Sequence, residues 1–154
     1  MRGEADWGAL LLRVGLGIIF VMHGYLAFAV LGPRVAAGYI VRMGYPQALA
    51  DLLAWYLIVV HTAGGILMIL GFWTRIAALA QLPIMASALF LLHARQGFFM
   101  KGIILDAATG RAIAGGYEFV FLVLVATLAV ILIGPGAFAL DRPPDRRVSD
   151  ARPV

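Results

Sequence analysis

Apolar residues gather into four long runs along this chain, and most polar residues lie between the runs. The pattern predicts helices over residues 8–31, 52–72, 76–94 and 117–135. Each run is near the length needed to cross about 30 Å of hydrocarbon at about 1.5 Å per residue. The expected fold is therefore an all-α membrane protein, an antiparallel bundle of four transmembrane helices.

The connections between the runs differ in length and chemistry. The sequence GFWTRI leaves room only for a tight antiparallel hairpin between the second and third helices. The longer first connection predicts a short interfacial helix starting at Pro46, with Tyr45 at the headgroup level. Two extended pieces around DAATG predict a small extramembrane β-hairpin between the third and fourth helices. Within the third helix, Gln81, Pro83 and Ser87 predict a bend whose freed backbone groups are satisfied by neighbouring helices.

Four crossings place both termini on one side of the membrane, together with the GFWTRI turn. Residues 1–141 are expected to form one domain that starts with an uncleaved first helix, because MRGEADWG lacks the basic region of a signal peptide. Residues 142–154 are Pro-rich and charged, which predicts a disordered basic tail. Basic residues are slightly more frequent on the side of the termini, and this predicts cytoplasmic termini.

Composition supports the membrane assignment. Of 154 residues, 63% are hydrophobic and 13% are charged, which is too apolar for a water-soluble domain of this size. The net charge of +4 comes from loops and the tail, so no nucleic-acid partner is expected. The absence of cysteine excludes disulfides, thiolate metal sites and dithiol redox chemistry.

The ionisable residues within the runs favour one half of the bundle. His23 and His61 lie at nearly the same depth, roughly 12 Å from the outer helix ends at about 1.5 Å per residue. His93 ends the third helix at the outer surface, and Glu118 begins the fourth helix there. Arg13 lies near the inner boundary, where it is expected to snorkel to the headgroups. Ionisable side chains inside a membrane indicate function, so a site in the outer half is predicted.

Small residues share helix faces with the two central histidines. Gly64 and Gly65 lie on the histidine face of the second helix, and Gly17 and Gly24 lie on one face of the first. Small residues let membrane helices approach closely. Close packing of these faces would bring the two histidines together, in a site that lies between the first, second and fourth helices and opens to the outer surface.

Purely structural roles remain open for each of these residues. His61 can hydrogen-bond a neighbouring carbonyl, and His93 and Arg95 can anchor a helix end at the interface. Glu118 can interact with the dipole of the helix it begins. The glycines can serve packing alone.

In order along the chain, the sequence resembles the DoxX/DoxD-like family of small four-helix membrane proteins. The matching pieces are LLLRVGLGIIFVMHG, GGILMILGFWTRIAALA, LLHARQGFF, GGYEFVFLVL and GPGAFALD. The resemblance implies an inner-membrane protein, often linked to redox chemistry. In the DoxD branch it implies a subunit of thiosulfate:quinone oxidoreductase, and other members accompany oxidative-stress enzymes.

Two positions depart from the family pattern. The family usually has Glu three residues before the glycine pair of the second helix, where this chain has His61. A Lys is common shortly after the HG of the first helix, where this chain has Ala27. The position of His61 thus matches a polar position of the family, while the imidazole suits proton relay, a hydrogen bond to a quinone, or metal ligation.

The first functional hypothesis is a quinone-binding subunit of a membrane oxidoreductase. His61, His23 and Glu118 are the candidate catalytic residues, with the histidines as hydrogen-bond donors to the quinone. The candidate quinone-binding residues are His61, His23, His93, Tyr25, Tyr117 and Phe98. The sequence has no flavin or nucleotide motif, so electrons have to come from a redox partner protein or a small reductant.

Two other hypotheses remain. In one, His23 and His61 are the axial ligands of a b-type haem. In the other, the protein is a non-catalytic assembly subunit or a small-solute carrier, although the apolar inner half argues against a through-pathway. Membrane lipid is an expected partner under every hypothesis, and a homo-oligomer stays open.

Overall fold

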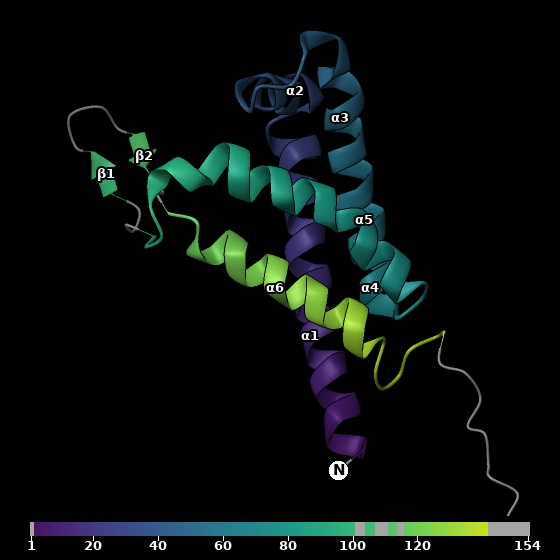
Figure 1. Cartoon of the computed structure of the whole chain (residues 1–154). Coiled ribbons are helices and arrows are strands. Elements are labelled where there is room, and N and C mark those ends of the chain that lie inside the picture. The colour runs from purple at the N-terminus through teal and green to yellow at the C-terminus, as the bar shows by residue number, and fades with distance from the viewer. Residues whose placement is uncertain (1, 101–103, 107–110, 114–115, 142–154) are drawn as a thin grey trace, which may run out of the picture.

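A computed structural model describes residues 2–100, 104–106, 111–113 and 116–141, and Figure 1 shows that helices make up most of it. Three long helical runs each combine α-helix with a π-helical segment, and a fourth helix follows. The helical elements are α1 (Arg2–Tyr25), π-helix η1 (Leu26–Val30), α2 (Pro33–Arg42), α3 (Gln47–Val59), π-helix η2 (Val60–Gly64), α4 (Gly65–Leu70), α5 (Thr74–Ser87), π-helix η3 (Ala88–His93), 3₁₀-helix η4 (Ala94–Gln96) and α6 (Glu118–Ile133).

Three helices are long and apolar enough to cross a membrane, namely Gly3–Val30, Gln47–Leu70 and Thr74–Gln96. The apolar helix α6 has 16 residues, which extend about 24 Å at about 1.5 Å per residue, against about 30 Å of hydrocarbon. The predicted α-helical membrane class is confirmed, with three helices of spanning length and a shorter fourth.

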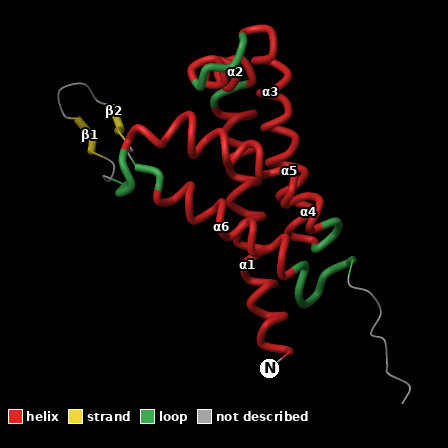
Figure 2. The backbone as a smooth tube through the Cα atoms, in the orientation of Figure 1, coloured by secondary structure: helices red, strands yellow, loops and turns green. Residues whose placement is uncertain are grey.

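The helices pack as two pairs that cross each other. Helix α1 lies along α4 and η2, while α5 lies along α6, and α6 also contacts α1. Figure 1 shows the α5 and α6 pair running obliquely across α1, and Figure 2 shows the same path as a backbone tube. Helix α2 packs on α3 at the end of the molecule away from the N-terminus. The two ends of the molecule are therefore built differently.

Large apolar side chains cover the outside of all four main helices. Leu11, Leu52, Ile76 and Leu132 are 61–79% exposed in the isolated chain. In water, such a surface would promote aggregation, whereas in lipid it is solvated by acyl chains. The outer surface thus supports a membrane location independently of helix length.

Both ends of α6 are tied to opposite ends of the molecule. At its start, the amide of Glu118 donates to the carbonyl of Phe98, just beyond η4. After its end, the amide of Ala137 donates to the carbonyl of Asp6 near the start of α1. Helix α6 therefore runs antiparallel to α5 over the length between these two contacts.

A seam of glycines lets α1 and α4 touch through their backbones. A Cβ built on Gly17 would lie 2.7 Å from the carbonyl oxygen of Gly65, and one on Gly65 would lie 2.7 Å from that of Gly17. Two turns further along α1, Gly24 packs directly against Thr62. These contacts confirm the predicted close approach of the first and second long helices.

Arg13 does not snorkel to the headgroups, and that expectation is wrong. Its side chain is only 1% exposed. The guanidinium donates to four carbonyls, at Pro135 (2.6 Å), Met68 (2.8 Å), Ile69 (2.7 Å) and Ala137 (2.9 Å). The last carbonyls of a helix lack intrahelical partners, so Arg13 satisfies the end of α4 and binds the segment that follows α6. We call this set of contacts the Arg13 clamp.

The turn between α4 and α5 is stabilised from the same segment. Gly71 ends α4 in the left-handed conformation, with φ of 69°, a backbone geometry that favours glycine. The backbone amide of Thr74, at the start of α5, donates to Oδ2 of Asp141 at 3.1 Å, and the amide of Asp141 donates to the carbonyl of Gly71. Residues 134–141 therefore bind both Arg13 and the turn between α4 and α5.

The sequence predicted that the short helix of the first connection starts at Pro46. The short helix is instead α2, which begins at Pro33. Pro33 occupies the first turn of α2, where its missing amide costs nothing. Pro46 instead precedes α3, which continues without a breaker through η2 into α4. The second long helical run therefore begins at Gln47.

Two short strands lie in the third connection. Strand β1 (Ile104–Asp106) pairs antiparallel with β2 (Arg111–Ile113), with Ile104 opposite Ile113 and Asp106 opposite Arg111. This is the position for which a small hairpin was predicted. The predicted tail, residues 142–154, lies outside the described residues.

Candidate functional site

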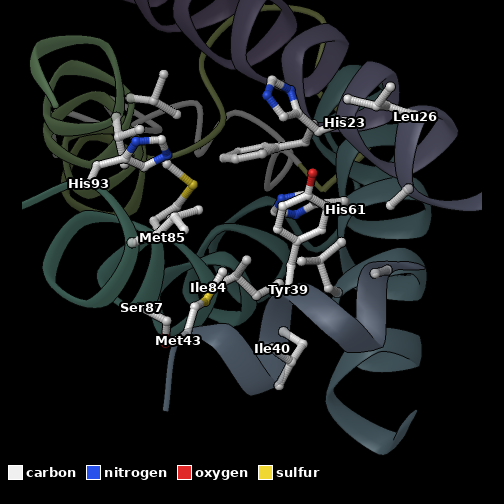
Figure 3. A pocket seen from close by; sticks show the side chains of 18 of the residues that line it. His23, Leu26, Tyr39, Ile40, Met43, His61, Ile84, Met85, Ser87 and His93 are labelled. Atoms are coloured by element: carbon white, nitrogen blue, oxygen red, sulfur yellow. The ribbon is translucent and has the colours of Figure 1, made fainter. Parts of the chain in front are cut away.

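A cavity of about 500 Å³ lies at the end of the molecule that carries α2. Its walls come from α1, η1, α2, α3, η2, α5, η3 and α6, and most of its lining is apolar. All three histidines of the chain line it, and Figure 3 shows His23, His61 and His93 on different sides of the same space. Apolar pockets with a few convergent polar groups are the usual form of small-molecule sites.

His61 is held rigidly at the inner side of this cavity. Its side chain is 5% exposed, and its Nδ1 lies 2.6 Å from Oε1 of Gln81. Gln81, which is fully buried, donates from Nε2 to the carbonyl of Val60 at 2.9 Å. Gly64 makes room for this amide, because a Cβ there would lie 2.9 Å from Nε2 of Gln81. A glutamine from α5 therefore orients the histidine of η2.

His23 faces His61 from α1. Its Nδ1 lies 2.9 Å from the carbonyl oxygen of Ile19, one turn earlier. The imidazole centroids of His23 and His61 are 6.2 Å apart and the rings are nearly perpendicular, while the Phe20 ring lies 5.2 Å from that of His61. The packing thus brings together the two histidines whose convergence was predicted from equal depth and glycine faces.

His93 lines the cavity from the last residue of η3. It is half-buried, and its Nδ1 lies 2.9 Å from Oε1 of Gln96. It lies immediately before η4 in the chain.

All three π-helical segments contribute to the cavity wall. Leu26 and Ala27 come from η1, His61 from η2, and Leu92 and His93 from η3. A π-helical segment is a local departure from the regular α-helical ladder and is frequently found at functional sites. Its occurrence in each of the three long helical runs, at the same end of the molecule, marks this cavity as the place where regular packing is interrupted.

A family model described as DoxX matches residues 8–94. The chain belongs to the DoxX family. The matched stretch carries all three histidines, the three π-helical segments and α2, and so includes most of the cavity wall of this DoxX protein.

Two relatives extend the likeness over almost the whole chain. The Bacillus subtilis (strain 168) protein named "Putative oxidoreductase CatD" is 30% identical over 141 residues, which cover 92% of this chain and 90% of that protein. The Escherichia coli (strain K12) protein named "Inner membrane protein YqjF" is 29% identical over 143 residues, which cover 92% of this chain and 95% of that protein. No solved structure matches the chain.

Several residues proposed from the sequence lie away from the cavity lining of this DoxX protein. Tyr25 is 56% exposed. It follows His23 by two residues, and two residues in an α-helix at this spacing point to nearly opposite faces. Glu118 accepts a hydrogen bond from the backbone amide of Met100 through Oε1 at 3.0 Å. Phe98 and Tyr117 contact each other, with centroids 5.3 Å apart, and so pack beside the start of α6.

Polar cavity residues that the sequence analysis missed come from α2 and its flanks. Tyr39 projects from α2, and Figure 3 shows its hydroxyl between His23 and His61. The hydroxyl of Tyr45 donates to Oγ of Ser87 at 2.7 Å, and Ser87 donates to the carbonyl of Pro83 at 2.7 Å. The Gly-Pro pair that begins α2 was the available signal, because Pro favours the first turn of a helix.

Proposed function

We propose that this DoxX protein binds a quinone in the cavity and acts as a membrane subunit of a quinone-linked oxidoreductase system. The observation that carries the proposal is an apolar cavity of about 500 Å³ in which two fixed imidazoles face each other within a membrane protein. A quinone head is a flat apolar ring with polar oxygens at its edge. It needs apolar walls and a small number of hydrogen-bonding groups.

The described residues fit such a ligand. His61 and His23 are placed to hydrogen-bond a ring oxygen, and Tyr39 offers a hydroxyl to the same space. Phe20, Met85 and Val123 supply apolar wall. His93 is the titratable group toward the polar end of the cavity, where protons can exchange with water. The relative named as an oxidoreductase supports redox chemistry in general terms, and the sequence supplies no flavin or nucleotide motif, so a redox partner protein is part of the proposal.

A haem between His23 and His61 is a poor fit. A porphyrin held by both imidazoles would have to lie between α1 and η2. Those elements touch where Gly24 packs against Thr62, and α1 touches α4 where Gly17 meets Gly65. A visible absorption spectrum of the purified protein tests this alternative, because bound haem would give an intense band.

We further propose that the domain formed by residues 1–141 crosses the bacterial inner membrane four times, with both termini in the cytoplasm. The ties at both ends of α6 support a fourth crossing, because they lie at opposite ends of the molecule. The relative named as an inner membrane protein supports the location. A short helix can be accommodated by local thinning of the bilayer at modest cost.

The test of ligand binding is His61→Leu in full-length protein in lipid nanodiscs, titrated under nitrogen with decylubiquinol, the reduced form of a short-chain quinone. We predict that affinity falls by about tenfold or more, since one hydrogen bond is lost and the pocket shape changes. Thermal stability should change by only about 1 kcal/mol, the usual scale for a side-chain hydrogen bond inside a membrane.

Thr127→Val is the matched control. Thr127 is fully buried, donates to the carbonyl of Val123 at 2.7 Å, and does not line the cavity. It should leave affinity unchanged. Equal affinities of wild type and His61→Leu would remove His61 from the site, and no binding by wild type would remove the quinone proposal.

A further inference from the structure

The hydrogen bonds of Gln81 fix which end of its amide faces His61. The carbonyl of Val60 can only accept a hydrogen bond, so the amide nitrogen of Gln81 has to face it, at 2.9 Å. The amide oxygen then faces Nδ1 of His61, at 2.6 Å. A flipped amide would place its oxygen against the carbonyl oxygen of Val60, so that two acceptors would face each other and the hydrogen bond of Gln81 to Val60 would be lost.

The protonation of the His61 ring follows from this orientation. The oxygen of Gln81 only accepts, so Nδ1 of His61 carries the hydrogen. Among the described residues that line the cavity there is no Asp, Glu, Lys or Arg, and a charged imidazole in this apolar setting would lack a counter-charge. A neutral imidazole has one donor nitrogen and one acceptor nitrogen. Nε2 of His61 is therefore a hydrogen-bond acceptor.

His23 is exposed, and its Nδ1 also faces a backbone carbonyl. Its Nδ1 lies 2.9 Å from the carbonyl of Ile19, which also only accepts, so its Nε2 is an acceptor in the neutral ring. His23 and His61 lie 6.2 Å apart between centroids and line one cavity. The cavity thus contains two imidazoles that each hold their own hydrogen in a bond to the protein. In this arrangement both rings offer acceptors to a ligand, whereas the sequence-based expectation gave both rings as donors to a quinone.

We infer that the cavity selects the hydroxyl-bearing, reduced form of its ligand, a hydroquinone, over the quinone. This inference rests on the proposed function and names the form of the ligand that the site prefers. A hydroquinone hydroxyl donates to an imidazole Nε2, whereas a quinone carbonyl and an imidazole Nε2 are both acceptors and repel. Gln81 is the positioning residue for this preference, since it holds the acceptor nitrogen of His61 available.

Binding of three matched probes tests the preference in full-length protein in nanodiscs under nitrogen. The probes are durohydroquinone, duroquinone and the dimethyl ether of durohydroquinone. Durohydroquinone should bind about tenfold more tightly than duroquinone. The reduced probe makes a hydrogen bond to an imidazole nitrogen where the oxidised probe meets a repulsive contact. The ether keeps the ring and methyl groups but has no hydroxyl, so it should bind no more tightly than duroquinone.

Gln81→Met tests the positioning role, because it keeps the volume of the side chain and removes both hydrogen bonds. The preference for durohydroquinone should fall toward unity while both probes still bind. Thr127→Val should keep the wild-type preference. Nitrogen-15 NMR of histidine-labelled protein reads the ring directly. It should show His61 protonated at Nδ1 and unprotonated at Nε2 in wild type, and a mixture of forms in Gln81→Met.

The outcomes separate this inference from the proposed function. Equal or tighter binding of duroquinone, or a His61 ring protonated at Nε2, would overturn the inference and leave quinone binding standing. An unchanged preference in Gln81→Met would overturn the role of Gln81. Absence of binding by every probe would overturn the proposed function, and this inference with it.

Discussion

At the scale of single residues, Arg13 shows how a membrane protein can bury a cation on carbonyl groups. The guanidinium has five N–H groups in a fixed planar fork, and three of its nitrogens donate to four carbonyls from two distant segments. Met68 and Ile69 lie in the last turn of α4, where the carbonyl of Met68 also accepts from the amide of Gly71. The side chain therefore acts as the common cap of two segments.

We predict that Arg13→Leu destabilises the protein by about 3 kcal/mol or more, because several buried carbonyls lose their donor. Arg13→Lys should lose less, since an ammonium keeps the charge but cannot reach all four oxygens in the planar arrangement of Arg. Unfolding in a graded denaturing detergent, followed by circular dichroism, measures both changes.

Arg95→Leu is the control for the loss of a cation, because Arg95 is exposed in η4. It should change stability by no more than about 0.5 kcal/mol. Similar stabilities of the Arg13→Leu and Arg95→Leu variants would show that Arg13 is solvated by headgroups instead of holding the clamp.

At this scale, the position of a residue along its helix could be predicted from the sequence. Its hydrogen-bond partners on other helices could not. The depth of His23 and His61 follows from counting residues, so their convergence was predictable. Gln81 was interpreted only through a bend in its own helix, because its bonds to Val60 and His61 come from another segment. Arg13 was misjudged for the same reason, since half of its partners lie beyond α6.

At the scale of elements, the glycine seam decides how α1 meets α4 and η2. Gly17 and Gly65 place each other's carbonyl oxygen where a Cβ would be. Membrane helices associate through such close van der Waals contact, because lipid provides no hydrophobic drive between them. The seam therefore sets the separation of the helices that carry His23 and His61.

We predict that Gly65→Ala destabilises the protein by about 1–3 kcal/mol, the usual cost of overpacking. The methyl would meet backbone atoms of α1, which cannot move without separating the helices. Gly15→Ala is the matched control, since nothing lies within 4 Å of its Cβ position, and it should be neutral or slightly stabilising. Thermal unfolding in nanodiscs compares the two, and an equal response would contradict direct seam contact.

Helix existence was easier to predict than helix boundaries. The four apolar runs are long and uniform, so each predicts a helix, and helices occur there. Helix α2 has only 10 residues, and Ala36, Ala37 and Ile40 are buried where it packs on α3. A hydropathy pattern cannot supply that tertiary contact, which explains why the helix was assigned to the wrong side of Tyr45.

At the scale of the whole molecule, the two ends have different structures. The end with α2 holds the cavity and the π-helical segments, while the opposite end holds the Arg13 clamp and the segment after α6. The clamp end is fixed by backbone and guanidinium hydrogen bonds. The cavity end is therefore where a ligand can enter without breaking the connection between the helices.

The proposed four crossings predict the side on which single cysteines react. The chain has no native cysteine, so Glu4→Cys, Arg95→Cys and Leu140→Cys can be labelled without background. A membrane-impermeant maleimide should label Arg95→Cys in intact cells. It should label Glu4→Cys and Leu140→Cys only after permeabilisation, because α6 returns the chain to the side of the N-terminus.

Labelling of Leu140→Cys and Arg95→Cys from the same side would show that α6 does not cross. Labelling of Glu4→Cys in intact cells, with Arg95→Cys protected, would keep four crossings and reverse the orientation. The two results are distinct, so the number of crossings and their direction are tested separately.

The Arg13 clamp has a consequence for the order in which the protein is made. Arg13 is synthesised before its acceptors at Pro135 and Ala137, which follow 122 and 124 positions later. Until those residues leave the ribosome, the first helix carries a guanidinium with an incomplete set of acceptors. Released chains that end at residue 133 should therefore be digested by protease faster than released chains that end at residue 141, which contain both acceptors. Helix α1 therefore gains its full set of guanidinium hydrogen bonds only after the segment behind α6 has been made.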